Sequence, residues 1–252
     1  MSCSSIMFGI FLVAPCHQLG GDINEAVAAT VSNPQRPAED VAKDSNRKPA
    51  EVLAFFDIKP GMTVLDLFSG SGYYTELLDS LVGDAGRVIA HTNEAYIPFS
   101  GEVYQKRYLD GRLGRTETII AEADDLEFEE NSLDAAMLVL TWHDFLYSDL
   151  ENGWNAINEG LLLEKLCIAI RPGGVLGLID HVANQGGDPA QVAKDLHRVD
   201  PQVVRDRFTQ TCFTLEAESE ALRNKNDDHT LAIFDPSVRG KTDRFVFRFI
   251  RN

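Results

Sequence analysis

The chain lacks several features that mark whole classes of proteins. Its 252 residues include 23 lysines and arginines against 39 aspartates and glutamates, so the formal net charge is −16. No cluster of basic residues offsets this charge, and a negative field of this size repels phosphate backbones. The composition therefore argues against nucleic acid as a partner or substrate.

Cysteine is also scarce. The four cysteines form no Cys-x-x-Cys pair and show no spacing typical of a metal site: Cys3, Cys16, Cys167 and Cys212. We therefore predict no disulfide framework. Cys167 lies in an apolar helical segment and is expected to be a small core residue.

Long hydrophobic runs are missing as well. The apolar run at 6–14 is far too short to span a bilayer as a helix, although it has the length of a signal-peptide core. The basic residues that normally precede such a core are absent. We interpret residues 1–35 as a leader and linker, either signal-like through residues 5–16 or disordered. Residues 36–252 are predicted to form one domain.

Strand and helix patterns alternate along this domain. Strands are predicted at 63–68, 87–91, 116–121, 133–140, 175–181, 213–219 and 244–250. Helices are predicted near 73–81, 101–112, 152–170 and 189–210. The alternation indicates an α/β fold with a largely parallel sheet and helices on both faces. A polar loop without a clear helix separates the last two strands.

A glycine-rich turn follows the first predicted strand. Asp66 stands at the end of this buried strand, and Gly70 and Gly72 permit a tight turn whose backbone can approach a ligand closely. The next helix directs its free N–H groups at the same place. This combination favours a cofactor that carries a nucleoside.

The spacing of the turn distinguishes between such cofactors. A dinucleotide fingerprint requires glycine or alanine where this chain has Thr75, which weakens the interpretation as a nicotinamide-dependent oxidoreductase. The segment 66–72 instead resembles motif I of the class I S-adenosylmethionine-dependent methyltransferases, with Phe68 in place of the first glycine. The Lys-Pro-Gly at 59–61 and the Arg-Pro-Gly-Gly at 171–174 resemble the turns that lead into the first and fifth strands of that family.

This resemblance implies a Rossmann-like methyltransferase fold, a three-layer sandwich whose seven-stranded, mostly parallel sheet has an antiparallel last strand. The polar segment 223–243 further resembles a bacterial group of predicted methyltransferases that carry signal-like N-terminal segments. The implied cofactor is S-adenosyl-L-methionine, and the implied activity is methyl transfer to a small-molecule acceptor. A module that holds the cofactor without turnover remains an alternative.

The family pattern also assigns cofactor-binding residues. Asp66 would hold the methionine amine, while Phe68, Gly70 and Gly72 would form the hairpin around the methionine and ribose. The acidic residue that usually binds the ribose is absent after the second strand, where Asn93 or Glu94 is the substitute. The segment after the third strand places Glu122 and Ala123 at the adenine.

Catalytic candidates follow from the sheet itself. Ligands of open α/β sheets bind outside the carboxyl ends of the strands, so residues after strands four and five should face the transferred methyl group. His143 with Asp144, and His181, occupy these positions and are our candidates for acid/base chemistry, with His197 as a weaker one. Nothing in the sequence fixes a ligand geometry, so no metal is predicted.

The sequence leaves the cellular location open. A supply of S-adenosylmethionine favours the cytoplasm, whereas a signal-like segment at 5–16 would imply export or anchoring. No stable insertion into a membrane is predicted. The oligomeric state is not indicated.

Overall fold

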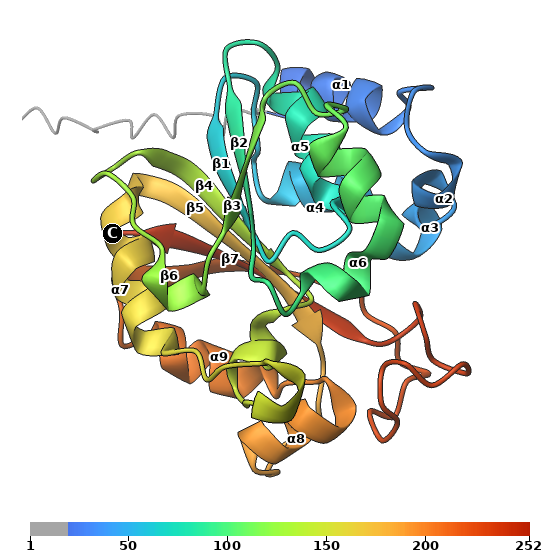
Figure 1. Cartoon of the computed structure of the whole chain (residues 1–252), viewed down its shortest axis with the longest axis vertical. Coiled ribbons are helices and arrows are strands. Elements are labelled where there is room, and N and C mark those ends of the chain that lie inside the picture. The colour runs from blue at the N-terminus through green and yellow to red at the C-terminus, as the bar shows by residue number, and fades with distance from the viewer. Residues whose placement is uncertain (1–19) are drawn as a thin grey trace, which may run out of the picture.

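The computed structural model describes residues 20–252 as one sheet with helices packed around it (Figure 1). The strand order is β3-β2-β1-β4-β5-β7-β6. The strands are β1 (Thr63–Leu67), β2 (Arg87–Thr92), β3 (Thr116–Ile120), β4 (Leu133–Val139), β5 (Ile170–His181), β6 (Phe213–Ser219) and β7 (Arg244–Arg251). The helices are α1 (Gly20–Val31), α2 (Ala38–Val41), α3 (Asp44–Arg47), α4 (Pro49–Phe55), α5 (Tyr73–Val82), α6 (Ile97–Tyr104), α7 (Glu159–Ala169), α8 (Pro189–Leu196) and α9 (Pro201–Phe208).

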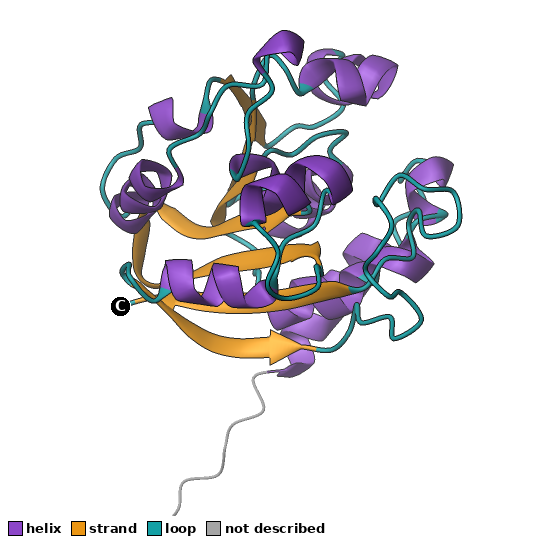
Figure 2. Cartoon of the chain, turned by 90° about the horizontal axis from the view of Figure 1, so that it is seen from below, coloured by secondary structure: helices purple, strands orange, loops and turns teal. Residues whose placement is uncertain are grey.

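Helices cover both faces of the sheet, which gives three layers (Figure 2). The α1, α4 and α5 helices contribute to one hydrophobic cluster, and α7 and α9 contribute to the other. Strand β4 shows why the central strands are mostly apolar, because Ala135 and Met137 belong to the first cluster while Ala136 and Leu138 belong to the second. A strand buried on both faces has no polar side to expose.

The pairing confirms the predicted fold class. Parallel ladders join β3, β2, β1, β4 and β5, whereas β7 lies antiparallel between β5 and β6. The connection between β6 and β7 contains no helix, as the sequence predicted, so β7 returns directly beside β6. This topology is the Rossmann-like methyltransferase fold.

The segment before residue 36 differs from the expected linker. Residues Gly20–Val31 form α1, and Val27 is buried in the cluster formed by α4 and α5. The folded unit therefore includes α1, because apolar residues on one face of this helix pack against residues of α4 and α5. The apolar run at 6–14 and the signal-like interpretation of 5–16 lie outside the described residues.

The helix predicted at 189–210 is two helices. His197 ends α8 with a left-handed backbone (φ 52°), and Asp200 caps α9 by accepting a hydrogen bond from the Gln202 N–H. Pro201 disfavours a helical conformation for the residue before it and fits the first position of a helix. The prediction of one continuous helix was wrong because this Asp-Pro start signal was overlooked.

Two other expectations are corrected by the structure. The helix predicted at 152–170 begins only at Glu159. Cys167 and Cys212 are joined in a disulfide that ties α7 to the turn before β6, so the expectation of unpaired cysteines was wrong. The two residues are 45 positions apart in the sequence and become neighbours only when the helix packs against the sheet. Among residues 20–252, no helix is long and apolar enough to cross a membrane.

Candidate active site

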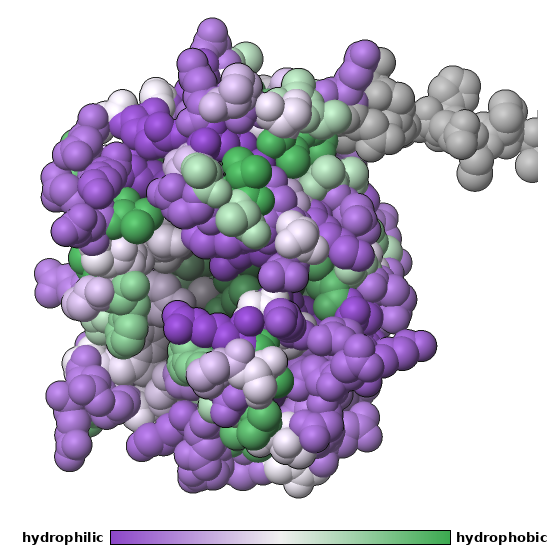
Figure 3. Space-filling view, turned by 90° about the vertical axis from the view of Figure 1, so that its right-hand side faces the viewer, coloured by the Kyte–Doolittle hydropathy of each residue, from purple (hydrophilic) through white to green (hydrophobic). Residues whose placement is uncertain are grey.

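A cavity of about 550 Å³ opens at the carboxyl ends of β1, β4 and β5. Figure 3 shows the hollowed side of the molecule, where pale and green residues lie within a rim of hydrophilic ones. The size falls in the range of small-molecule sites. Its wall includes the glycine turn, the segment after β2, the segment after β4 and the connection between β6 and β7.

The first functional group in the cavity is the carboxylate of Asp66. This residue is 2% exposed, lines the cavity and accepts a hydrogen bond from the Thr75 hydroxyl at 2.6 Å. Burial raises the pKa of Asp66 to about 6, and the bond from Thr75 only partly opposes this effect. Arg47 of α3 lies on the same wall. The pair presents one anion and one cation, which matches the ammonium and carboxylate of an amino-acid group.

The two glycines of the turn have different surroundings. Gly70 (φ 56°) lines the cavity, and a Cβ placed on it would lie 3.4 Å from the Tyr96 ring. Gly72 (φ 77°) faces away, and a Cβ there would lie 2.5 Å from side-chain atoms of Arg107 and Tyr108. Gly70 therefore leaves space for a ligand, whereas Gly72 leaves space for the neighbouring chain segment.

Phe68 replaces the usual first glycine without disrupting the turn. Its backbone is left-handed (φ 51°), and its N–H donates to His91 Nδ1 at 3.3 Å. The ring packs against His91, Tyr96, Phe145 and Trp154 with centroid distances of 4.8 to 5.6 Å. This aromatic packing offsets the cost of a left-handed conformation in a residue that carries a Cβ.

The residues predicted to bind ribose and adenine lie outside the wall of the cavity, and two of them, Asn93 and Glu122, bind each other. The Asn93 amide donates to Glu122 at 3.1 Å and accepts from the Tyr96 N–H at 3.0 Å. Glu122 also accepts from the Asn155 amide at 3.0 Å, while Ala123 is fully buried in the core. Asn93, Glu122, Ala123 and Glu94 do not line the cavity. Tyr96 and Trp154 take their place in its wall.

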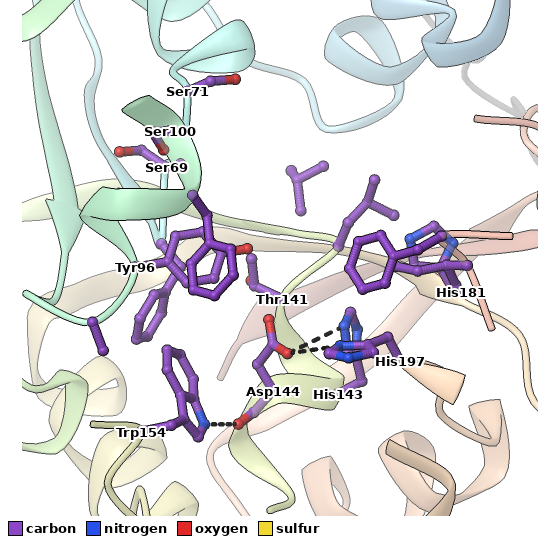
Figure 4. Close-up of a pocket in the computed structure, with 18 of the residues that line it drawn as sticks. Ser69, Ser71, Tyr96, Ser100, Thr141, His143, Asp144, Trp154, His181 and His197 are labelled. Carbon is purple, nitrogen blue, oxygen red and sulfur yellow. Dashed lines mark hydrogen bonds and ion pairs between the residues drawn. The ribbon is translucent and has the colours of Figure 1, made fainter. Parts of the chain in front are cut away.

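At the end of the cavity away from Asp66 and Gly70, strands β4 and β5 bring histidines and carboxylates together (Figure 4). The Nδ1 atom of His143 lies 2.8 Å from Asp180 Oδ1, and its Nε2 atom lies 3.3 Å from Asp144 Oδ1. His197 reaches the same Asp144 oxygen with its Nδ1 atom at 3.4 Å. His181 lines the cavity and hydrogen-bonds Thr242 through Nδ1 at 2.6 Å.

The two central histidines have opposite protonation tendencies. Burial disfavours charge on His143, but the carboxylates of Asp144 and Asp180 outweigh it and raise its pKa to about 9. Burial, together with the nearby cations Arg244 and His143, holds the pKa of His181 well below its ordinary value. His181 is therefore a neutral imidazole at physiological pH, while His143 holds a proton between two carboxylates.

Several cavity residues were not identified from the sequence. Tyr96 and Trp154 carry no motif, and Arg47 belongs to a short helix far from the turn in sequence. Thr141 was placed after the fourth strand, but only the structure shows that its Oγ1 is buried without a hydrogen-bond partner beside the cavity. His197, in contrast, was a weaker candidate from the sequence and does line the cavity; the Asp-Pro pair at 200–201 was the further signal, since it indicates a helix break at which a side chain can turn toward the sheet.

Comparisons with known proteins show that the chain is similar to methyltransferases. Residues 27–101 match the model of the protein-L-isoaspartate(D-aspartate) O-methyltransferase family. A ubiquinone/menaquinone biosynthesis C-methyltransferase of Shewanella sediminis is 26% identical over 176 residues, which cover 69% of this chain and 64% of that protein. The corresponding protein of an Enterobacter species is 35% identical over 124 residues, covering 49% of this chain and 44% of its own.

Solved structures show the same architecture. A SAM-dependent methyltransferase from Aquifex aeolicus superposes with a TM-score of 0.57 at 20% identity, covering 86% of this chain and 99% of its own. A geranyl diphosphate methyltransferase superposes with a TM-score of 0.54 at 13% identity, covering 89% of this chain and 95% of its own. The chain therefore has the fold of the class I S-adenosylmethionine-dependent methyltransferases, and parts of its sequence are similar to the methyltransferases named above.

Proposed function

We propose that this protein is an S-adenosylmethionine-dependent methyltransferase that acts on a small-molecule acceptor. The observation that carries the proposal is the single cavity shared by Asp66 and Gly70 at one end and by His143, Asp144 and His181 at the other. The fold and the related methyltransferase sequences support the choice of cofactor.

The amino-acid end of the cofactor has a matched set of partners. Asp66 would accept hydrogen bonds from the ammonium, Arg47 would pair with the carboxylate, and Gly70 leaves room for the chain between them. When bound, S-adenosylmethionine supplies a methyl group on a sulfonium that an acceptor atom attacks in line. The protein contributes by holding the acceptor at the right distance and angle.

A hydroxyl acceptor would also need to lose a proton. Neutral His181 can take that proton because its Nδ1 is occupied by Thr242 and its pKa is low enough to leave the ring unprotonated. His143 is fixed by Asp180 and is positioned beside Asp144. We propose that this cluster carries the acid/base chemistry of the acceptor end.

The acceptor itself is proposed to be small and to have an apolar body. Phe99, Trp154, Ile233 and Phe234 give the cavity apolar walls, and the strongly acidic chain disfavours a polyanion. The name of the related Shewanella enzyme refers to ubiquinone and menaquinone biosynthesis, which makes ring compounds of quinone type a reasonable first set of acceptors to assay.

Calorimetric titration tests the cofactor assignment directly. We expect S-adenosylmethionine and S-adenosylhomocysteine to bind with 1:1 stoichiometry and NAD not to bind. Binding of NAD alone would overturn the proposal in favour of an oxidoreductase. Cofactor binding without methyl transfer to any quinone-type or phenolic acceptor would instead favour a module that binds the cofactor without turnover.

A further inference from the structure

Two histidines and an aspartate from separate elements converge beside the cavity. His143 and Asp144 belong to the short 3₁₀ turn after β4, and His197 belongs to the break between α8 and α9. One ligand-type atom from each residue lies within 4.8 Å of the other two. We propose that His143, Asp144 and His197 form a binding site for a divalent transition-metal ion.

The spacing of the donor atoms fits direct coordination. His143 Nε2 and His197 Nδ1 lie 3.3 and 3.4 Å from the same Asp144 oxygen. Zinc binds imidazole nitrogen and carboxylate oxygen at about 2.0–2.1 Å, so neighbouring donors of a tetrahedral site are about 3.3–3.4 Å apart. The two distances therefore match two edges of such a site, and the two imidazole nitrogens lie within 4.8 Å of each other.

A buried carboxylate orients the first histidine toward the site. Asp180 is fully buried, and its Oδ1 lies 2.8 Å from His143 Nδ1 while its Oδ2 accepts the His143 backbone N–H at 2.8 Å. Histidines that bind metals commonly use their second ring nitrogen in this way, which fixes the ring and increases its strength as a ligand. The arrangement leaves His143 Nε2 directed at Asp144, and a bound ion would displace the proton that this nitrogen otherwise shares with Asp144.

The second histidine is held by a specific backbone and by aromatic neighbours. His197 adopts a left-handed conformation (φ 52°), which is uncommon for a residue with a Cβ. Its ring packs edge-on against Tyr147 and Phe234 with centroid distances of 5.9 and 4.8 Å. Strained backbone conformations of this kind occur preferentially at functional sites.

Two histidines and one carboxylate indicate the class of ion and its task. This donor set suits zinc, iron(II) or cobalt(II) and leaves coordination positions open. All three residues line the cavity, so the open positions would face the proposed acceptor. An ion there would bind an oxygen atom of the acceptor, or a water molecule, and lower its pKa; His143 and Asp144 would then be occupied as ligands, and His181 would be the base of the acceptor end. No donor comes from the amino-acid end, so metal binding does not depend on the proposed cofactor.

The chain offers a matched control in His229. This residue also has a left-handed backbone (φ 64°) and also meets an aspartate, with Nε2 at 3.1 Å from Asp243 Oδ2. His229 does not line the cavity, and it does not belong to the cluster of His143, Asp144 and His197. Asparagine tolerates the left-handed region and is a poor ligand for these ions. His197→Asn and His229→Asn therefore make the same backbone-compatible change inside and outside the site.

The experiment uses the full chain without an affinity tag, stripped with a chelator and titrated with Co²⁺ and Zn²⁺ in the absence of cofactor. We expect one equivalent of Co²⁺ to give visible absorption bands that Zn²⁺ abolishes. His197→Asn should weaken binding by on the order of 100-fold, and Asp180→Asn by roughly 10- to 100-fold. His229→Asn should leave it unchanged.

Two results would overturn the proposal. One is the absence of saturable binding of either ion to the folded wild-type protein. The other is equal binding by wild type and His197→Asn, since this would place the ion elsewhere. Circular dichroism and the melting temperature establish that each variant is folded, and Asp144→Asn provides a second test of the site if His197→Asn fails to fold.

Discussion

The two sides of the cavity use the ends of their strands differently. At the ends of β2 and β3, Asn93 and Glu122 hydrogen-bond each other, Asn93 also accepts from the Tyr96 N–H and Glu122 from the Asn155 amide, and neither lines the cavity. At the ends of β4 and β5, His143, Asp144 and His181 all line it. Parallel strands end at one edge of a sheet in both cases, so position at a strand end is not sufficient to place a side chain in a site.

The difference arises from what covers each pair of strand ends. On the β2 side, the aromatic residues Phe68 and Tyr96 line the cavity, and the Phe68 ring packs edge-on against both His91 of β2 and Tyr96. At the β4 end, the tight 3₁₀ turn Trp142–Phe145 brings two consecutive polar residues beside the cavity. The local backbone geometry after the strand therefore decides which polar groups meet a ligand.

The largest effect is expected from filling the space at Gly70. Gly70→Val places a branched side chain toward Tyr96 in a backbone region that suits glycine, so S-adenosylhomocysteine affinity should fall about 100-fold or more. Isothermal titration measures this loss. Gly111→Val is the control, because Gly111 also has a positive φ (75°) but a Cβ there meets no atom within 4 Å. Equal affinities in wild type and Gly70→Val would show that the ligand does not pass this turn.

A smaller effect, confined to turnover, is expected at the β5 end. His181→Ala removes the neutral imidazole beside the cavity and should reduce methyl transfer about 100-fold, with cofactor affinity nearly unchanged. Single-turnover rates with the acceptor that proves active measure the change. A drop in cofactor affinity with an unchanged single-turnover rate would make His181 a structural residue.

Replacing the carboxylate at the β1 end should have an effect that depends on pH. Asp66→Asn removes the negative partner of the cofactor ammonium and should weaken binding by roughly tenfold at pH 7.5. Because the pKa of Asp66 is raised to about 6, wild-type affinity should fall as the pH drops through 6, while the affinity of the variant should not. Calorimetric titrations with the cofactor at pH 5, 6 and 7.5 compare the affinities of wild type and Asp66→Asn.

The raised pKa of Asp66 also predicts how the folding stability of wild type differs from that of Asp66→Asn, and in which direction. A carboxyl group whose pKa is higher in the folded state binds more protons there between pH 4 and 6, so folding stability falls as the pH rises through this window. We expect Asp66→Asn to gain up to about 3 kcal/mol relative to wild type between pH 4 and 6. The free energies of unfolding of wild type and Asp66→Asn are measured with urea at several pH values in this range. If they differ by the same amount at every pH, the raised pKa of Asp66 is contradicted.

The smallest effect is expected on the β2 and β3 side. Glu122→Gln keeps an acceptor oxygen for only one of the two donors, Asn93 and Asn155, but Glu122 lies outside the cavity wall, so S-adenosylhomocysteine affinity should change by no more than about twofold. The adenine contact implied by the family pattern predicts a loss of tenfold or more. A loss of that size would mean that the aromatic wall moves when the cofactor binds and exposes Glu122.

Much of the fold was predictable because it depends on local patterns. The buried strands are short apolar runs, and the turn at 69–72 requires glycine, so both are visible in sequence. The break at His197 was also encoded locally, by Asp200 and Pro201, although we predicted a continuous helix there. The position of α1 was not visible in this way, because a single apolar face says little about the surface it packs against.

The amino-acid sequence by itself indicated the alternation of strands and helices, the acid and the glycines of the cofactor turn, and the histidines at the ends of β4 and β5, and the family resemblance implied the antiparallel last strand. Only the tertiary structure decided that Asn93 and Glu122 bind each other, that Cys167 meets Cys212, and that His197 joins His143 at Asp144. These contacts link residues far apart in the chain. They depend on how whole layers pack, and no local pattern of residues records that geometry.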